Sequence, residues 1–255
     1  MANAKFKRRS EIVRIVREKK QCLRRRLKPV PHYSDYKEIR KDLQELSEKG
    51  ELLRTFGGAM VREYGTERSL DQRIIQNLEQ KKRIAQKAVS TLKSGDLVAM
   101  DAGSTVTMMA KAIPDHLKIT VLTNSLEICN ILSEKENVTV ICTGGKLHKK
   151  SMSLQGMLTE STINSLNAEK AFISCAAFDI KLGVMDSNEE AARTKQSMIR
   201  NAREVYLLMD SSKIGCIAYI TTCPASSITK VVTDNAAAAE VVKRIEDLGI
   251  EMILA

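Results

Sequence analysis

Two segments near the amino terminus carry apolar residues at helical spacing. Residues 9–19 hold one stripe, and residues 36–49 hold a second that includes Ile39, Leu43 and Leu46. Asp35 is of a type that favours the start of a helix, and Gly50 is of a type that favours its end. The two segments therefore predict two helices.

The chain between and after these helices predicts smaller elements. Leu23, Leu27 and Val30 are spaced as on one face of a short helix within residues 20–33, which prolines would then end. Two short apolar runs flank Gly57-Gly58, as in a β-hairpin. Helix, short helix, helix and hairpin is the order of a winged helix-turn-helix. We therefore predict a winged helix-turn-helix DNA-binding domain over residues 1–62.

A different pattern follows. Residues 63–78 are polar and charged and predict a linker, and a helix is expected from about residue 79 to 92. Beyond it, short apolar runs alternate with amphipathic helical segments, which is typical of a mostly parallel sheet covered on both sides. We therefore predict an α/β domain over residues 79–255. Its expected strands are 97–100, 119–122, 138–142, 170–175, 205–209, 230–233 and 251–254, and its clearest helices are 125–134, 189–202 and 236–248.

Charge is concentrated at one end of the chain. The whole sequence of 255 residues has a net charge of +10, from 41 Lys and Arg against 31 Asp and Glu. Residues 1–30 contain twelve basic and two acidic residues, so this segment accounts for the entire excess. A basic run that coincides with helix-turn-helix spacing favours contacts with the phosphates of duplex DNA. In such a fold the second main helix enters the major groove, and its outward residues Tyr36, Lys37, Arg40 and Lys41 are the candidate DNA contacts.

Several classes of protein are excluded or disfavoured. No apolar run is long enough to span a bilayer, and the basic amino terminus has no apolar segment of a signal peptide behind it. The six cysteines show no metal-site spacing, and no dinucleotide or P-loop glycine motif is present. We expect a cytoplasmic protein without a metal or cofactor, whose cysteines are small core residues.

Polar residues follow several of the predicted strands. Asp101-Ala102-Gly103-Ser104-Thr105 joins the first strand to a helix, where free N–H groups attract an anion. Carboxyl ends of parallel strands meet at one edge of a sheet, which is where ligands bind in such folds. Hydroxyls, an amide, an acid and one lysine at that edge suit a phosphorylated sugar or polyol. The candidate ligand residues are Asp101, Gly103, Ser104, Thr105, Thr123, Asn124, Gly144, Gly145 and Lys213.

These motifs together resemble the DeoR family of bacterial transcriptional regulators. Ile39-Arg40-Lys41-Asp42-Leu43 is similar to the family's recognition-helix signature, and Arg54 to Ala59 resembles its wing. The resemblance adds Arg54, Gly57 and Gly58 as candidate DNA contacts. It implies a ribose-5-phosphate-isomerase-like effector domain in a cytoplasmic homo-oligomer, a dimer or tetramer. The expected function is repression of a carbohydrate-utilisation operon, with double-stranded operator DNA and a phosphorylated effector as partners and no membrane partner.

Departures from the family pattern leave alternatives open. Residues 21–31 are more basic than the family's usual first helix of the motif and contain two prolines. Ser174, Ala177 and Ala191 replace residues usual in the effector domain, so an effector-insensitive DNA-binding protein is one alternative. A sugar-phosphate isomerase that uses Asp101 or Asp210 as a base is another. We expect no catalytic residues, because the attached DNA-binding module has no use in an isomerase.

Overall fold

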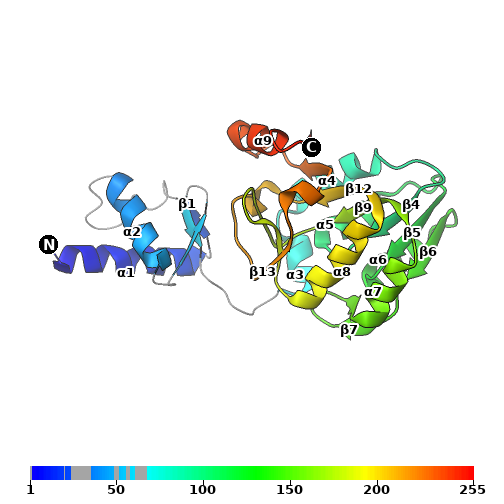
Figure 1. The fold of residues 1–255 in the computed structure, drawn as a ribbon, viewed down its shortest axis with the longest axis horizontal. Coiled ribbons are helices and arrows are strands. Elements are labelled where there is room, and N and C mark those ends of the chain that lie inside the picture. The colour runs from blue at the N-terminus through cyan, green and yellow to red at the C-terminus, as the bar shows by residue number, and fades with distance from the viewer. Residues whose placement is uncertain (1, 20, 24–35, 49–51, 56–57, 61–67) are drawn as a thin grey trace. The chain divides into compact units, whose positions relative to one another are not determined.

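The computed structural model describes residues 2–19, 21–23, 36–48, 52–55, 58–60 and 68–255 (Figure 1). They belong to two compact units. The first unit comprises Met1–Thr66 with the short segment Gly215–Ile217, and the second comprises Glu67–Ile214 with Ala218–Ala255.

The amino-terminal unit consists of two helices and a small antiparallel sheet. Helix α1 spans Ala2–Lys19 and α2 spans Tyr36–Glu48. Strands β1 (Gln21–Leu23), β2 (Leu53–Thr55) and β3 (Gly58–Met60) form the sheet in the order β1-β3-β2. The apolar stripes of both helices are buried in a single core, which confirms the two predicted helices and the hairpin. This core contains Ile12, Val13, Ile15, Val16, Ile39, Leu43, Leu46, Leu52 and Ala59.

One prediction for this unit was wrong over three residues. Gln21–Leu23 form strand β1, not part of a short helix, and pair antiparallel with Gly58–Met60. The free edge of β3 offers these residues backbone hydrogen bonds from a distant part of the chain. Local spacing carries no signal of such a pairing. The rest of the expected short helix falls in residues 24–35, which lie outside the described residues.

The second unit begins with two helices. Helix α3 spans Leu70–Ile75 and lies inside the segment for which a linker was predicted. The Ser69 hydroxyl accepts a hydrogen bond from the Gln72 backbone N–H, and the Gln72 side-chain oxygen accepts one from the Ser69 backbone N–H, so α3 starts with a capping box. Helix α4 follows at Leu78–Val89, close to the predicted helix.

A seven-stranded sheet forms the centre of this unit, and every pair in it is parallel. Its strand order is β15-β14-β12-β9-β4-β5-β6. This confirms the predicted α/β class with its mostly parallel sheet. The strands are β4 (Leu97–Met100), β5 (Ile119–Thr123), β6 (Val138–Cys142), β9 (Ala168–Ile173), β12 (Ala202–Leu208), β14 (Lys230–Thr233) and β15 (Glu251–Leu254).

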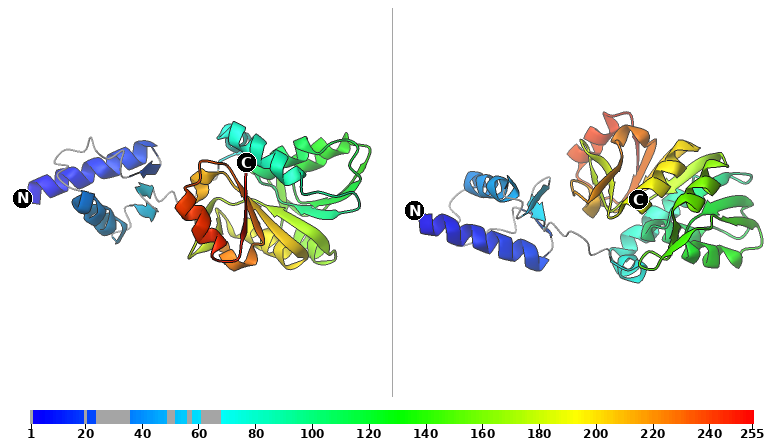
Figure 2. Two further views of the ribbon diagram at one scale, coloured as in Figure 1. Left: turned by 90° about the horizontal axis from the view of Figure 1, so that it is seen from above. Right: turned by 60° about the horizontal axis from the view of Figure 1, so that its bottom comes forward.

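Helices cover both faces of the sheet, as Figure 2 shows. Residues alternate between the two cores along each strand, so that Val98 and Met100 of β4 pack on one side and Ala99 packs on the other. Helices α4, α5 (Ser104–Ala112) and α6 (Leu126–Ser133) pack into the first core. Helices α7 (Met157–Asn164), α8 (Glu189–Arg200) and α9 (Ala239–Glu246) pack into the second core.

Two small antiparallel sheets were not predicted. Strands β7 (Lys146–His148) and β8 (Ser153–Gln155) form a hairpin. Strands β10 (Ala177–Asp179), β11 (Gly183–Asp186) and β13 (Ile220–Cys223) form a three-stranded sheet. Each strand has only three or four residues, which is too short to show a periodic pattern.

The strand order reverses next to β4. From β4 the chain moves outward through β5 to β6, then returns to the other side of β4 as β9 and moves outward in the opposite direction. The ends of β4 and β9 therefore flank a topological switch point, which is where open α/β sheets bind ligands. No described helix is long and apolar enough to cross a membrane.

Candidate functional site

Helix α2 presents a basic outer surface. Lys37, Arg40 and Lys41 are exposed, whereas Ile39 and Leu43 on the same helix are buried. Positions 37, 40 and 41 lie three and four residues apart and so share one face. This arrangement suits contact with the phosphates or base edges of DNA. The side chains of Tyr36 and Arg54, and the whole of Gly57, lie outside the described residues. Gly58 opens β3 and pairs with Leu23 and Thr55.

Two arginines of the basic amino terminus are held inside this unit. Asp42 of α2 is buried, and its carboxylate accepts from Arg8 Nε at 2.5 Å and from Arg9 Nε at 2.7 Å. Arg8 also reaches Glu38 at 3.0 Å, and Arg9 pairs with Glu45. A carboxylate removed from water is stabilised by such charge-assisted bonds. Part of the basic charge in residues 1–30 therefore fixes α1 against α2.

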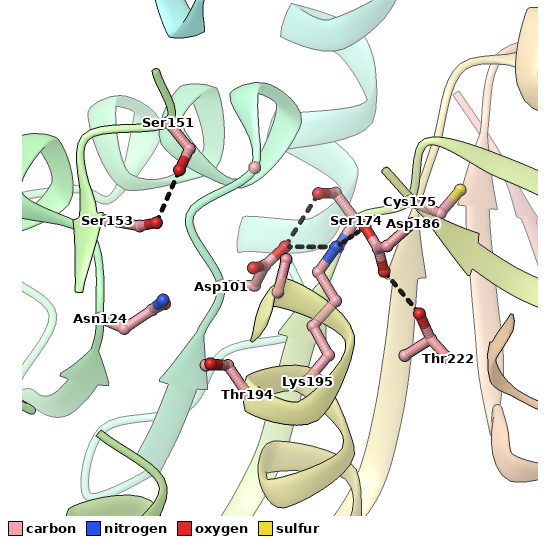
Figure 3. Close-up of polar contacts among 12 residues, drawn as sticks. Asp101, Asn124, Ser151, Ser153, Ser174, Cys175, Asp186, Thr194, Lys195 and Thr222 are labelled. Carbon is pink, nitrogen blue, oxygen red and sulfur yellow. Dashed lines mark hydrogen bonds and ion pairs between the residues drawn. The ribbon is translucent and has the colours of Figure 1, made fainter. Parts of the chain in front are cut away.

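At the switch point, Asp101 follows β4 and is almost completely buried. Its Oδ2 atom accepts two hydrogen bonds from Ser174, from the backbone N at 3.1 Å and from Oγ at 2.9 Å. Lys195 Nζ of α8 lies 3.6 Å from the same oxygen (Figure 3). One oxygen of Asp101 is thus fully engaged, and Oδ1 is left for another donor.

Lys195 lies between two buried carboxylates. Its Nζ is 2.5 Å from Asp186 Oδ1, and Thr222 Oγ1 donates to the other oxygen of Asp186 at 2.6 Å. Burial alone would lower the pKa of Lys195, but Asp101 and Asp186 outweigh it and raise the pKa. The ammonium group stays charged, as a buried ion-pair network requires.

The amino terminus of α5 lies beside Asp101. Gly103 is its N-cap and has no side chain to accept from the first N–H groups of the helix. Ser104 and Thr105 in the first turn are also largely buried. These N–H groups, the two hydroxyls and the positive end of the helix dipole form an anion-binding arrangement.

Gly103 has a steric reason to be glycine. A Cβ atom there would overlap the Ser174 hydroxyl and lie 3.2 Å from Asp101 Oδ2. The same close packing brings Asp101, Gly103 and Ser174 into one cluster. Sequence reasoning marked Ser174 only as a departure from a family pattern.

At the end of the neighbouring strand β5, Thr123 and Asn124 form hydrogen bonds to neighbouring strands. Thr123 Oγ1 donates to Met100 O at 2.7 Å and accepts from Ser125 N at 3.1 Å. The Thr123 hydroxyl therefore ties β5 to β4. Asn124 follows Thr123, and its Nδ2 donates to Leu154 O of β8 at 2.9 Å. In Figure 3 Asn124 comes from the strand next to that of Asp101.

The Gly144-Gly145 turn packs against this region. Both residues have positive φ, +71° and +120°, in the range where a side chain is strained. A Cβ on Gly145 would also lie 2.8 Å from Gln155 O. Thr159 Oγ1 of α7 donates to Gly144 O at 2.7 Å. The two glycines thus allow the turn after β6 to approach β8 and α7.

Lys213 belongs to a separate cluster at the same edge of the sheet. It ends a short 3-10 helix, Ser211–Lys213, that follows the buried Asp210. Asp210 Oδ1 accepts from Asn77 Nδ2 at 2.9 Å. Burial raises the pKa of the Cys175 thiol to about 12. The positive charges of Lys213 and Lys195 oppose this increase, because they favour the thiolate. Cys175 is therefore within electrostatic range of both Lys213 and Lys195.

A buried lysine completes this second cluster. Lys81 Nζ donates to Gln76 O at 2.6 Å and also to Arg73 O. Burial lowers the pKa of Lys81 to about 8, and the positive charges of Lys213 and Arg73 add to the effect. Sequence reasoning missed Lys81.

Sequence reasoning also missed Lys195 and Asp186. Lys195 occurs at three-residue spacing between Ala192 and Met198, and all three are buried. A charged residue within such an apolar stripe was the available signal. Among the described residues, no three His, Cys, Asp or Glu side chains are grouped to hold a metal ion. Cys142 is exposed, so the prediction of a core residue was wrong there, whereas Cys216 and Cys223 are buried.

Comparison with known families matches both units. Residues 8–64 match the model of the DeoR-like helix-turn-helix domain, and residues 76–235 match that of the DeoR C terminal sensor domain.

Curated relatives match over most of their length. The chain is 37% identical over 215 residues to the uncharacterized HTH-type transcriptional regulator YulB of Bacillus subtilis, covering 84% of this chain and 83% of the relative. It is 34% identical to the HTH-type transcriptional regulator GlpR of Haloferax volcanii, covering 84% of each. The glycerol-3-phosphate regulon repressor of Escherichia coli is 29% identical, covering 88% of this chain and 90% of the relative.

Solved structures match more remotely. Ribose 5-phosphate isomerase A from Methanocaldococcus jannaschii has a TM-score of 0.42 and 16% identity over 55% of each chain. The eIF2B delta structure from Chaetomium thermophilum has a TM-score of 0.45 and 14% identity, covering 64% of this chain and 58% of that one.

Proposed function

The chain belongs to the DeoR family of DNA-binding transcriptional regulators, and we propose that it represses a carbohydrate-utilisation operon until a phosphorylated sugar or polyol binds its α/β unit. Family membership makes it a regulator and not an isomerase. We propose a division into a DNA-binding domain over residues 1–62, a connecting segment over 63–78 and an effector domain over 79–255.

For DNA, the supporting observation is the basic exposed face of α2. We assign Lys37, Arg40 and Lys41 to DNA contact, with Tyr36, Arg54, Gly57 and Gly58 as further contacts of the helix and wing. Arg40 is central on that face, and an arginine reads guanine or binds phosphate with paired hydrogen bonds. A helix-turn-helix protein reads paired half-sites, so we propose a homodimer or a tetramer acting on operator DNA in the cytoplasm.

For the effector, the observation that carries the proposal is the pairing of an anion site with a carboxylate at the switch point. The first turn of α5, from Gly103 to Thr105, supplies N–H and O–H donors to a phosphate. Asp101 presents Oδ1 as an acceptor for a ligand hydroxyl. A phosphate ester of a polyol carries both complementary groups.

Lys213 supplies a positive charge to the proposed effector site. Its charge acts on the thiol of Cys175, the residue after Ser174, and the charge of Lys195 acts on the same thiol. We assign Lys213 to the phosphate as a point charge. Thr123, Gly144 and Gly145 support the site through the backbone contacts that hold the ends of β5 and β6.

A second candidate is a regulator that does not respond to an effector. Ser174 favours it, because its side chain occupies the space next to Gly103 and takes one oxygen of Asp101. Both candidates include DNA binding and differ only in ligand response.

A melting-temperature screen of the full chain against phosphorylated sugars and polyols separates the two. A ligand that binds the native state must raise the melting temperature. We expect at least one phosphate ester to do so at millimolar concentration, to release the protein from its operator, and to bind Lys213→Ala more weakly. The absence of any shift would establish the effector-insensitive candidate instead.

A further inference from the structure

Two buried side-chain amides, one after β5 and one at the end of β8, have oxygens with no hydrogen-bond partner among the described residues. Asn124 is 3% exposed and Gln155 is 2% exposed, and within the described residues neither Asn124 Oδ1 nor Gln155 Oε1 accepts a hydrogen bond. Nearly all buried polar atoms in proteins are paired, since an unpaired one loses its hydration without compensation. These two oxygens therefore point to a ligand.

The orientation of each amide is set by its nitrogen. Asn124 Nδ2 donates to Leu154 O at 2.9 Å, and Leu154 N returns a hydrogen bond to Asn124 O at 2.7 Å. Gln155 Nε2 donates to Ser153 Oγ at 3.4 Å. Each nitrogen thus has a partner within the protein, and the amide atoms without a partner are the two oxygens.

Strand register places Asn124 next to Asp101. Met100 of β4 is paired with Thr123 of β5, so the residues that follow them, Asp101 and Asn124, are neighbours at the edge of the sheet. Gln155 joins them because Asn124 is hydrogen-bonded to β8 in both directions at Leu154. The ends of β4, β5 and β8 therefore bring three acceptor oxygens to this edge of the sheet, Asp101 Oδ1, Asn124 Oδ1 and Gln155 Oε1.

Three acceptors require a ligand that donates hydrogen bonds. A phosphate dianion carries no proton to donate and is repelled by the Asp101 carboxylate, so its place is the N–H groups of α5. Hydroxyl groups donate readily, and adjacent hydroxyls on a carbon chain present donors side by side.

We propose that Gln155 and Asn124 are the specificity-determining residues of the effector site and accept hydrogen bonds from two neighbouring hydroxyls of the ligand. This rests on the proposed function and narrows it. The effector is a phosphate ester with adjacent free hydroxyls, and an analogue that lacks one of them is rejected. Rejection follows because the analogue would leave a buried oxygen unpaired in the complex.

The test uses the full chain and matched pairs of probes. Sugar phosphates and their deoxy counterparts, such as D-ribose 5-phosphate with 2-deoxy-D-ribose 5-phosphate and D-glucose 6-phosphate with its 2-deoxy form, are compared by melting temperature and then by calorimetric Kd. We expect the hydroxylated member of at least one pair to bind at least tenfold more tightly.

Gln155→Met separates recognition from folding. Methionine matches the length of glutamine but offers no strong acceptor, so the preference within that pair should fall to less than threefold. Relief of an unpaired buried oxygen should leave the melting temperature of the unliganded variant unchanged or higher. A purely structural Gln155 would instead lower it. Leu154→Met in the same strand is the control and should keep the preference.

Two failures are distinguishable. If a phosphate ester binds but its deoxy analogue binds equally, or Gln155→Met keeps the full preference, the inference is overturned and the proposed function stands. If no phosphate ester raises the melting temperature, both are overturned.

Discussion

Ser174 donates two hydrogen bonds to a single oxygen of Asp101, one from its backbone N–H and one from its hydroxyl. Because Lys195 also approaches that oxygen, the carboxylate is fixed in one orientation. A ligand bound as proposed would therefore meet Asp101 through Oδ1, with no need to reorient the side chain on binding. Fixed groups of this kind reduce the entropic cost of recognition.

The contact between Gly103 and Ser174 predicts a reciprocal pair of variants. Gly103→Ala should lower the free energy of unfolding by about 1–3 kcal/mol, because its Cβ would overlap the Ser174 hydroxyl. Ser174→Gly in the same chain removes that overlap, so the double variant should be more stable than Gly103→Ala alone. Urea unfolding of the four proteins measures the coupling. Additive effects would show that the two residues do not share the space.

Lys195→Met should be strongly destabilising. It leaves Asp101 and Asp186 buried without their shared cation, and removing one partner of a buried ion pair costs about 3–5 kcal/mol. Thermal and urea unfolding give the measurement. The matched control is Lys93→Met on an exposed position, which should change the free energy of unfolding by no more than about 0.5 kcal/mol. Equal effects of the two substitutions would contradict the role of the network.

Asp42→Asn should loosen the amino-terminal unit. The variant keeps the shape of the side chain but removes the charge that pairs with Arg8 and Arg9, at a cost of about 3–5 kcal/mol. Amide hydrogen exchange in α2 should become faster, and operator affinity should fall with it. Glu38→Gln is the control, because its carboxylate is 46% exposed and such pairs contribute about 1 kcal/mol or less. Unchanged exchange in Asp42→Asn would refute the prediction.

Arg40→Ala should weaken binding to a DNA fragment selected by the wild-type chain from a random pool. If Arg40 contacts a base edge, the binding free energy for this DNA should become less favourable by about 1–3 kcal/mol. If it binds a phosphate, the salt dependence of log K should instead decrease by about one unit of slope. Fluorescence anisotropy over a range of salt concentrations distinguishes the two. Lys118→Ala, an exposed charge of the α/β unit, should have neither effect.

Lys81 predicts a pH dependence in the alkaline range. Burial lowers its pKa to about 8, from an ordinary value of 10.5 that the unfolded chain retains. Between these values the unfolded chain binds a proton that the folded chain does not, so the free energy of unfolding should rise with pH. Lys81→Met should lose this component, and the wild type should gain stability relative to it from pH 8 to pH 10. A pH-independent difference would contradict the shift.

Local patterns were enough to predict the main helices and the parallel sheet. The stripe through Ile39 and Leu43 predicted α2, and the apolar runs predicted all seven strands of the large sheet in chain order, although several strand ends differ by one to three residues. Asp101, Gly103 and Ser104 were found because a strand, a tight turn and a helix start are adjacent in sequence.

The missing parts depend on contacts between distant residues. Nothing near Lys195 in the sequence shows that Asp101 approaches it, and nothing near Gln155 shows that its oxygen is left unpaired. Thr123 had the right position for a ligand contact, but its hydroxyl bonds to Met100 on the neighbouring strand. Three-residue strands such as β1 and β7 exist because of their partners, which sequence spacing does not reveal.

The buried chain of contacts from Ser174 through Asp101, Lys195 and Asp186 to Thr222 has a wider consequence. It joins the end of β9 and the end of β4 to α8, β11 and β13. The ammonium group of Lys195 therefore links the central sheet to the small antiparallel sheet through ion pairs. A ligand bound to Asp101 as proposed would therefore change the electrostatic environment of residues in both sheets, including residues that it does not contact.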